Sequence, residues 1–251
     1  LVCYRLIDPG SEFRFHREWY VRSAIGDLLG EDYSLAQKDK AYRCLDMLLE
    51  HRDELFGFLK GQWGKLFEAK YDVLLYDLTS TYFESEPPPP DAVSKKRFGY
   101  SRDKRSDCVQ VVVALVLTPE GFPVAYEVYP GNTRDTATLG EFLDRIEKQY
   151  GKFRRTWLMD RGIPTEEMLE KMRERGIDYL VGTPKGHLTG VEKPLLEKTW
   201  VEARENVRVK ILQQGPEFYV YVESQDRVSK ERSMRRRRLR RLWAGLRELR
   251  N

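Results

Sequence analysis

The sequence predicts an α/β protein built on a mixed β-sheet, with a helical region before it and a strand-rich region after it. Two short apolar runs, Val73–Tyr76 and Thr156–Met159, are each followed directly by an aspartate, Asp77 and Asp160. Between these runs lie two further strand patterns and one amphipathic helix. Because that order lets the first and fourth strands lie side by side, we expect the two aspartates to meet at one place in the sheet.

Composition and length describe a rather polar globular chain that is long enough to bury a substantial core. The chain has 251 residues, of which 41% are hydrophobic and 33% are charged. Its sequence has no stretch that approaches the roughly 20 apolar residues of a membrane span. Three scattered cysteines cannot form a disulfide framework, so we expect a reducing, cytoplasmic setting. The start at Leu1, without an initiator methionine, suggests a fragment.

The net charge of +4 is distributed unevenly along the chain. Residues 230–250 hold ten Lys and Arg residues against Glu231 and Glu248, which gives this segment a charge of about +8. The remainder of the chain is therefore near −4. A segment of this kind either meets an anionic partner or is heavily solvated.

Residues 1–70 are expected to form an N-terminal helical region without a candidate catalytic cluster. In its second half, apolar residues recur at three- and four-residue steps, as in a helix with one face on a core. They are Tyr42, Leu45, Leu48, Leu49, Leu55, Phe56 and Leu59.

Residues 71–186 show the pattern of the sheet and its crossing helices. The expected strands are 73–78, 109–117, 122–129, 155–159 and 179–182. The expected helices are 135–150, where Asp135 or Thr136 can cap the first turn, and 166–175. The proline-rich stretch 86–91 can be neither strand nor helix. With the first three strands antiparallel and the later ones parallel, the order β-β-β-α-β-α-β is the ribonuclease H-like arrangement, by analogy of fold alone.

Residues 187–251 are expected to form a strand-rich insertion followed by a basic helix. Two strand patterns, 207–212 and 218–222, flank Gln214-Gly215-Pro216, which is a hairpin signature. The basic helix begins at Ser229 and continues to the end of the chain.

Asp77 and Asp160 are the candidate catalytic and metal-binding residues. Phosphoryl transfer with two divalent metals needs carboxylates from separate elements, and their hard oxygen atoms suit Mg²⁺ or Mn²⁺. Each aspartate could instead simply end a strand and cap a turn. Glu84 could be a third ligand if the first strand continued past a bend, although a solvated residue is the simpler interpretation.

Two basic segments could bind phosphate groups. The loop 95–105 also carries Phe98 and Tyr100, whose rings could stack on unpaired bases. The run Arg235–Arg238 covers every face of a helix, which would supply affinity without sequence choice. Solvation is the alternative for the loop, and a solvated or oligomerising helix is the alternative for the C-terminal run.

Four ordered blocks resemble bacterial DDE transposases of the insertion-sequence-four superfamily. These blocks are residues 76–84, 99–107, 130–135 and 159–162, and the likeness covers nearly the whole chain. The resemblance implies a ribonuclease H-like core that uses Mg²⁺ to cut transposon ends and join them to target DNA. Asp77 and Asp160 then match the first two catalytic aspartates, and a strand-rich insertion follows the fifth strand. A homodimer is implied because two transposon ends must be held together.

With DNA as the implied partner, the cationic residues of both basic segments and the one beside Asp160 become candidate DNA-binding residues. They are Lys95, Lys96, Arg97, Arg102, Lys104, Arg105, Arg161, Arg235, Arg236, Arg237 and Arg238.

One block of the family pattern is absent from the sequence. The third catalytic carboxylate is expected from a glutamate beyond the insertion, in a pattern of Tyr, Arg, Glu and Lys that does not occur before Asn251. We therefore expect a chain truncated before its last ligand, with weak metal binding and poor catalysis. Two alternatives stay open: a ribonuclease H-like nuclease that completes its site with Glu84 or Glu231, and a catalytically dead DNA-binding remnant.

Overall fold

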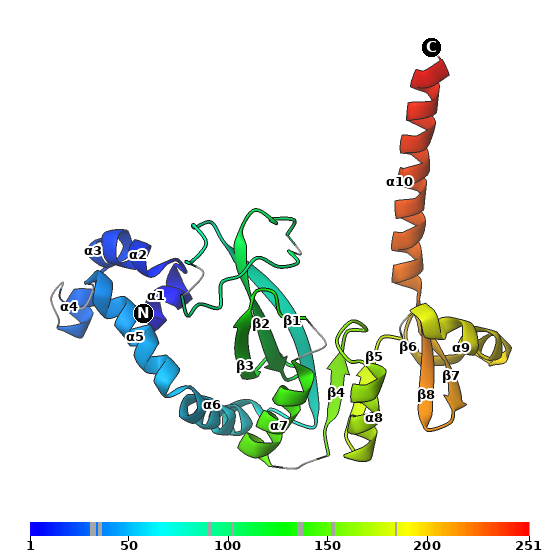
Figure 1. The fold of residues 1–251 in the computed structure, drawn as a ribbon, viewed down its shortest axis with the longest axis horizontal. Helices are drawn as coiled ribbons and strands as arrows, with labels where there is room; N and C mark the ends of the chain where they lie inside the picture. Colours follow the sequence, from blue (N-terminus) through cyan, green and yellow to red (C-terminus); the bar gives the residue numbers. More distant parts are fainter. Residues whose placement is uncertain are drawn as a thin grey trace. The chain divides into compact units, whose positions relative to one another are not determined.

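The computed structural model describes residues 1–30, 34, 37–89, 92–101, 103–134, 138–151, 154–183 and 185–250. The chain divides into two compact units, Leu1–Leu180 and Val181–Asn251, and each is described by itself (Figure 1). Within the described part, no helix is both long enough and apolar enough to cross a membrane.

The first unit begins with short helices around a small aromatic core. The buried residues of this core are Tyr4, Phe15, Tyr20 and Ala41. The helical elements are α1 (Val2–Ile7), α2 (Glu12–Arg14), the π-helical turn η1 (Phe15–Trp19), α3 (Tyr20–Arg22), α4 (Ile25–Leu29), α5 (Lys38–Glu50) and α6 (Arg52–Phe67).

The apolar stripe expected between Tyr42 and Leu59 does not lie on a core along its length. The chain leaves the α-helix at His51, between α5 and α6, so the stripe is divided between two helices. On α5, Leu45 and Leu48 remain exposed. On α6, Phe56 packs against Tyr126, with their ring centroids 5.8 Å apart.

A five-stranded mixed sheet forms the centre of this unit, in the order β3-β2-β1-β4-β5. β1 pairs antiparallel with β2 and parallel with β4, while β2 pairs antiparallel with β3. The expected ribonuclease H-like arrangement is therefore confirmed, including the neighbouring first and fourth strands. The strands are β1 (Val73–Phe83), β2 (Val109–Leu117), β3 (Pro123–Pro130), β4 (Thr156–Met159) and β5 (Asp178–Val181).

Helices α7 (Leu139–Tyr150) and α8 (Glu166–Glu174) connect β3 to β4 and β4 to β5. The ring of Tyr76 in β1 packs against the rings of Phe142 in α7 and Trp157 in β4, with centroid distances of 5.3 Å and 6.4 Å. Because side chains alternate along a strand, Leu74, Tyr76 and Leu78 of β1 are buried, whereas Asp77 is exposed on the other face.

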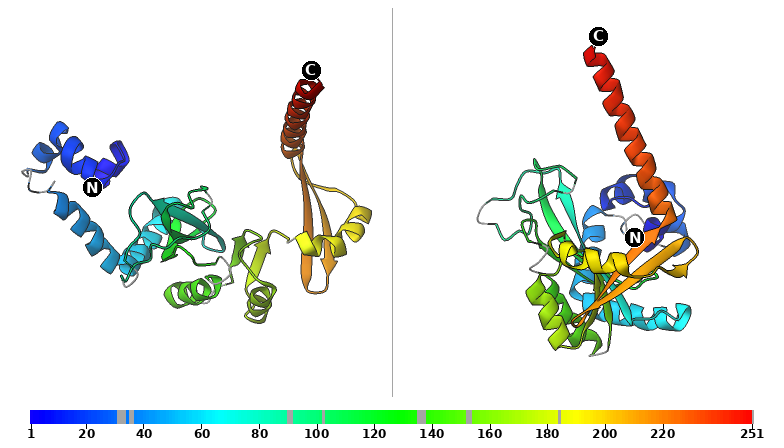
Figure 2. Two further views of the ribbon diagram at one scale, coloured as in Figure 1. Left: turned by 45° about the horizontal axis from the view of Figure 1, so that its top comes forward. Right: turned by 90° about the vertical axis from the view of Figure 1, so that its right-hand side faces the viewer.

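The second unit pairs a helix with a three-stranded antiparallel sheet, from which a long helix continues (Figures 1 and 2). The expected hairpin is confirmed, while the first helix and strand of this unit were not expected. On one face of the sheet, the Lys210 ammonium donates a hydrogen bond of 2.8 Å to the Leu196 carbonyl. The elements are α9 (Lys185–Glu197), β6 (Val201–Arg204), β7 (Val207–Gln214), β8 (Glu217–Ser224) and α10 (Gln225–Arg250).

Candidate active site

The parallel pairing of β1 with β4 brings Asp77 and Asp160 together. Tyr76 lies opposite Met159 in this pairing, so the next residue of each strand places Asp77 opposite Asp160. Neighbouring strands are about 4.8 Å apart, which is close enough for two carboxylates to share one metal site. Since Tyr76 and Met159 are both buried, alternation directs both aspartates to the opposite face, where both are exposed.

The strand that carries Asp77 is longer than the sequence predicts. The expected end at residue 78 is wrong, because β1 continues to Phe83. The polar residues after Leu78 stay extended because each of them has a partner on the apolar strand β2, as Thr79 does in Val113. Asp77 is therefore held within a long paired strand, at the point where the pairing with β4 ends.

Asp160 is held differently, at the start of a turn. It follows the last residue of β4, and the Ile163 N–H donates to its carbonyl oxygen at 3.1 Å. Its carboxylate also accepts a hydrogen bond from the Arg161 N–H at 2.7 Å. A short strand and a closed turn thus fix this side chain beside β1.

The donor set of the two aspartates fits Mg²⁺ or Mn²⁺. One oxygen of Asp77 accepts a hydrogen bond of 2.8 Å from the Leu78 N–H, and one oxygen of Asp160 is bonded in the same way. Within the part of the chain that is described, the second oxygen of each carboxylate has no hydrogen bond. Mg²⁺ is commonly held by one or two carboxylates together with water and substrate phosphate.

A third carboxylate does not join this pair among the described residues, where no group of three His, Cys, Asp or Glu could hold a metal. Glu84 lies seven residues beyond Asp77, and β1 pairs with β2 without a register shift up to Phe83. At 3.3 Å per residue, Glu84 is about 23 Å from Asp77, and it pairs with Arg105 at 2.6 Å. β1 has no bend between Asp77 and Phe83, so the alternative in which Glu84 completes the site is wrong.

Glu231, the other proposed substitute, lies on α10 in the second unit. Its carboxylate pairs with Arg227 at 2.8 Å and with Arg235 at 3.8 Å. The hydrogen bond from Arg227 lowers the pKa of Glu231.

The basic loop lies beside the far end of β1 and is joined to β2 by a backbone bridge between Arg97 and Gln110, and several of its cations also have partners in the protein. The Lys96 ammonium lies 4.3 Å from the centre of the Phe83 ring, and the Arg105 guanidinium lies 5.0 Å from that of Tyr82. Lys95 donates a hydrogen bond of 2.6 Å to the Val128 carbonyl. Any phosphate contact by these three cations would have to compete with their partners in the protein.

Arg105 has the largest set of partners in the loop. It donates to Asp107 at 2.9 Å and to Glu84 at 2.6 Å. These hydrogen bonds raise the pKa of Arg105, and the bond from Arg105 lowers the pKa of Asp107 to about 2. The residue therefore orders the end of the loop.

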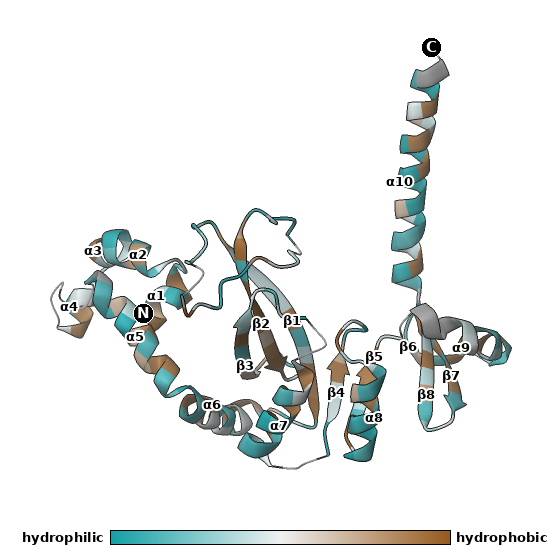
Figure 3. Ribbon diagram, viewed as in Figure 1, coloured by the Kyte–Doolittle hydropathy of each residue, from teal (hydrophilic) through white to brown (hydrophobic). Residues whose placement is uncertain are grey.

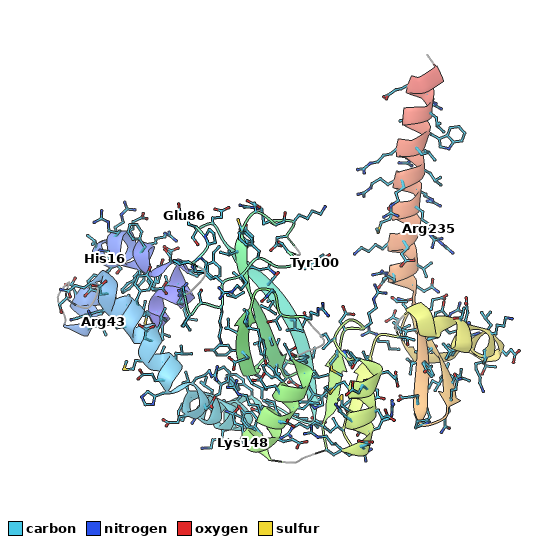
Figure 4. The ribbon with its side chains drawn as sticks, in the orientation of Figure 1. His16, Arg43, Glu86, Tyr100, Lys148 and Arg235 are labelled. Carbon is cyan, nitrogen blue, oxygen red and sulfur yellow. The ribbon has the colours of Figure 1, made fainter. Side chains whose placement is uncertain are left out.

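The other candidate DNA-binding residues lie in different surroundings. Arg97 donates to the Lys96 carbonyl at 2.9 Å, and Lys104 has a left-handed backbone with φ of 60°. Arg161 is exposed immediately beside Asp160. Arg102 lies outside the described residues. The remaining candidates are exposed on α10 and are Arg235, Arg236, Arg237 and Arg238, of which the first is labelled in Figure 4.

Gln110, which sequence reasoning missed, joins two of the four motif blocks. This residue of β2 is only 2% exposed. Its side-chain amide donates to the Gly131 carbonyl at 2.8 Å and to the Tyr100 carbonyl at 3.1 Å. At Gly131 a Cβ atom would lie 2.1 Å from the Gln110 carbonyl oxygen, so a side chain there would clash. A polar residue within the apolar run 109–117 was the available signal.

The family assignment follows from a match that contains both aspartates. A family model described as the transposase DDE domain matches residues 68–245. The chain belongs to this family. No curated protein sequence matches the chain significantly.

Three solved transposase structures are similar to this chain at low identity. One is the cryo-EM structure of the piggyBac transposase synaptic complex with hairpin DNA, with 12% identity, a TM-score of 0.38, and coverage of 86% of this chain and 50% of that chain. The Mos1 transposase paired-end complex with left transposon end has 11% identity, a TM-score of 0.30, and coverage of 71% and 56%. The crystal structure of a pre-cleavage Mos1 transpososome has 10% identity and a TM-score of 0.30, and the match covers 71% of this chain and 57% of that chain. This DDE-domain chain spans about half the length of the transposases that it matches.

Proposed function

We propose that the protein carries out the DNA cutting and joining steps of transposition by metal-dependent phosphoryl transfer. The observation that carries this proposal is the register of β1 and β4, which sets Asp77 beside Asp160 within the segment matched by the transposase DDE family. DNA, both as transposon end and as target, is the substrate. When Mg²⁺ or Mn²⁺ is bound by these aspartates, it would activate the attacking oxygen and stabilise the leaving oxygen.

The protein's own contribution is to hold two carboxylates at a fixed and accessible place. Asp77 is held by strand pairing on β1, and Asp160 is held by the turn that follows β4. Rigid placement offsets the mutual repulsion of the two anions, since neither side chain can move away without breaking a hydrogen bond. Both carboxylates are exposed, so the phosphate backbone of DNA can approach them, and Arg161 is placed to attract it.

We expect DNA cleavage by this chain to be slow, because no third carboxylate joins the two aspartates among the described residues. Two carboxylates leave more coordination positions to water, which weakens metal binding. A cytoplasmic homodimer completes the proposal, since two transposon ends must be held together during transposition.

The experiment is a nicking assay on supercoiled plasmid DNA with Mn²⁺. Wild-type protein should nick the plasmid slowly, and Asp77→Asn and Asp160→Asn should each abolish nicking. Asp72→Asn is the matched control, because Asp72 is an exposed aspartate immediately before the same strand. Glu84→Gln should also retain activity.

Two results would count against the proposal. Nicking that survives both site substitutions would place the chemistry elsewhere in the molecule. DNA binding by the wild-type protein without any nicking would favour the catalytically dead remnant.

A further inference from the structure

Helix α10 presents one row of arginines that lines a groove. Arg232, Arg236 and Arg240 follow each other at four-residue steps, and a shallow groove of about 470 Å³ lies along them. The other residues lining this groove are Ser229, Ser233 and Arg237. Along most of its length the helix is hydrophilic (Figure 3).

The helical period explains why these residues share a face while their sequence neighbours do not. Four residues advance the chain by slightly more than one turn, about 40° around the axis and about 6 Å along it. The consecutive run of four arginines is thereby divided. Arg236 and Arg237 line the groove, whereas Arg235 and Arg238 do not.

The charge of this row is not neutralised by the acidic residues of the helix. Glu231 pairs with Arg227 and Arg235, which lie off the groove. Among the described residues, no ion pair involves Arg232, Arg236 or Arg240. Three unpaired guanidinium groups on one concave face therefore create a local positive potential.

The spacing of the row suits a phosphate backbone. Arg232 and Arg240 are about 12 Å apart along the helix axis, and one strand of a DNA duplex advances about 3.4 Å per phosphate. The three arginines, about 6 Å apart along the helix, can therefore each contact a different phosphate of one strand. Guanidinium groups bind phosphate oxygens in bidentate fashion, and the hydroxyls of Ser229 and Ser233 can donate to the same oxygens.

We propose that the groove formed by Arg232, Arg236 and Arg240, with Ser229 and Ser233, binds the sugar-phosphate backbone of one DNA strand. This proposal rests on the proposed function, from which DNA is the partner. It replaces the expectation that the whole run of residues 235–238 contacts DNA.

A basic helix with apolar residues could also lie on an anionic membrane. Leu239, Leu242 and Leu246 are exposed on α10. The helical period places Leu242 on the side opposite the two serines and places Leu239 and Leu246 beside Arg232. DNA is favoured because the proposed function supplies it as the partner and because the arginine row carries a positive charge that no described carboxylate of α10 neutralises.

The test compares two triple substitutions that remove the same charge from one helix. The groove variant removes the three charges of the row by Arg232→Gln, Arg236→Gln and Arg240→Gln. The control variant removes three charges outside the groove by Arg227→Gln, Lys230→Gln and Arg241→Gln. Glutamine and arginine have similar helix propensities, and circular dichroism confirms folding. Binding is measured by fluorescence anisotropy on a labelled random-sequence duplex between 50 and 200 mM salt.

The groove variant should bind the duplex roughly thirtyfold more weakly at low salt, because it loses three charge-assisted contacts. Its slope of log affinity against log salt should fall by about 2.7, since each phosphate contact contributes about 0.9. The control variant should stay within roughly threefold of the wild-type affinity and should keep the wild-type slope.

Equal losses in the two variants would overturn the proposal, because charge alone would then explain binding. If the two variants bind alike while Asp77→Asn still abolishes nicking, the groove fails and the proposed function stands. If the wild-type protein binds vesicles of phosphatidylserine through the groove but does not bind the duplex, DNA as the partner fails as well.

Discussion

Replacing Gln110 by methionine tests whether this buried amide holds the motif loops together. Methionine keeps the length and volume of the side chain but removes both donors, to Gly131 and to Tyr100. Each hydrogen bond contributes about 0.5–1.5 kcal/mol, and a buried carbonyl left without its donor costs about 1–3 kcal/mol. We expect Gln110→Met to lower the free energy of unfolding by about 2–4 kcal/mol.

Urea unfolding followed by near-ultraviolet circular dichroism measures this change as a shift of the midpoint by roughly 1 M or more at unchanged slope. Gln149→Met is the matched control. The side-chain oxygen of Gln149 is buried and has no hydrogen-bond partner in the described part of the chain, and its amide makes only a 3.4 Å contact with the Asp53 carbonyl. This control should change stability by less than about 0.5 kcal/mol. Equal effects of the two substitutions would refute the reasoning.

Three further substitutions have defined outcomes. Gly57→Ala, inside α6 with no atom within 4 Å of the added Cβ, should raise the free energy of unfolding by about 0.5–1 kcal/mol; a lower melting temperature would contradict this. Arg105 holds the pKa of Asp107 at about 2, below its usual 3.8, so this carboxylate stabilises the fold above about pH 4 and loses that effect towards pH 2. The stability difference between wild type and Asp107→Asn should therefore shrink over that range, and a constant difference would exclude the pair. Tyr76→Phe removes a 2.8 Å hydrogen bond to Thr138 and should lower the free energy of unfolding in urea by about 1 kcal/mol. An unchanged free energy would mean that Tyr76 stabilises the fold through the packing of its ring alone.

The order of the sheet and the meeting of its two aspartates could be predicted because both depend on local patterns. The runs before Asp77 and Asp160 are apolar, and the segment between them has the length and composition of two strands and a crossover helix. A parallel neighbour for the first strand then follows from the chain connections. The hairpin around Gly215 was predictable for a similar reason, since turn residues separate two strand patterns.

Other features depend on distant partners and could not be read from their own segments. The polar stretch Thr79–Thr81 resembles a strand end, but its partners on β2 keep it extended. The role of Gln110 depends on the carbonyls of Tyr100 and Gly131, which approach from two separate loops. The start of α10 likewise could not be read from the basic run alone. That start is Gln225 rather than the expected Ser229.

The central claim is that Asp77 and Asp160 form one metal site, and calorimetric titration with Mn²⁺ tests it most directly. Wild-type protein and Asp72→Asn should bind Mn²⁺ with the same weak affinity. Asp77→Asn and Asp160→Asn should each lose that binding, because neither carboxylate alone retains the ion. Unchanged binding in either site variant, or no Mn²⁺ binding by the wild-type protein, would contradict the account.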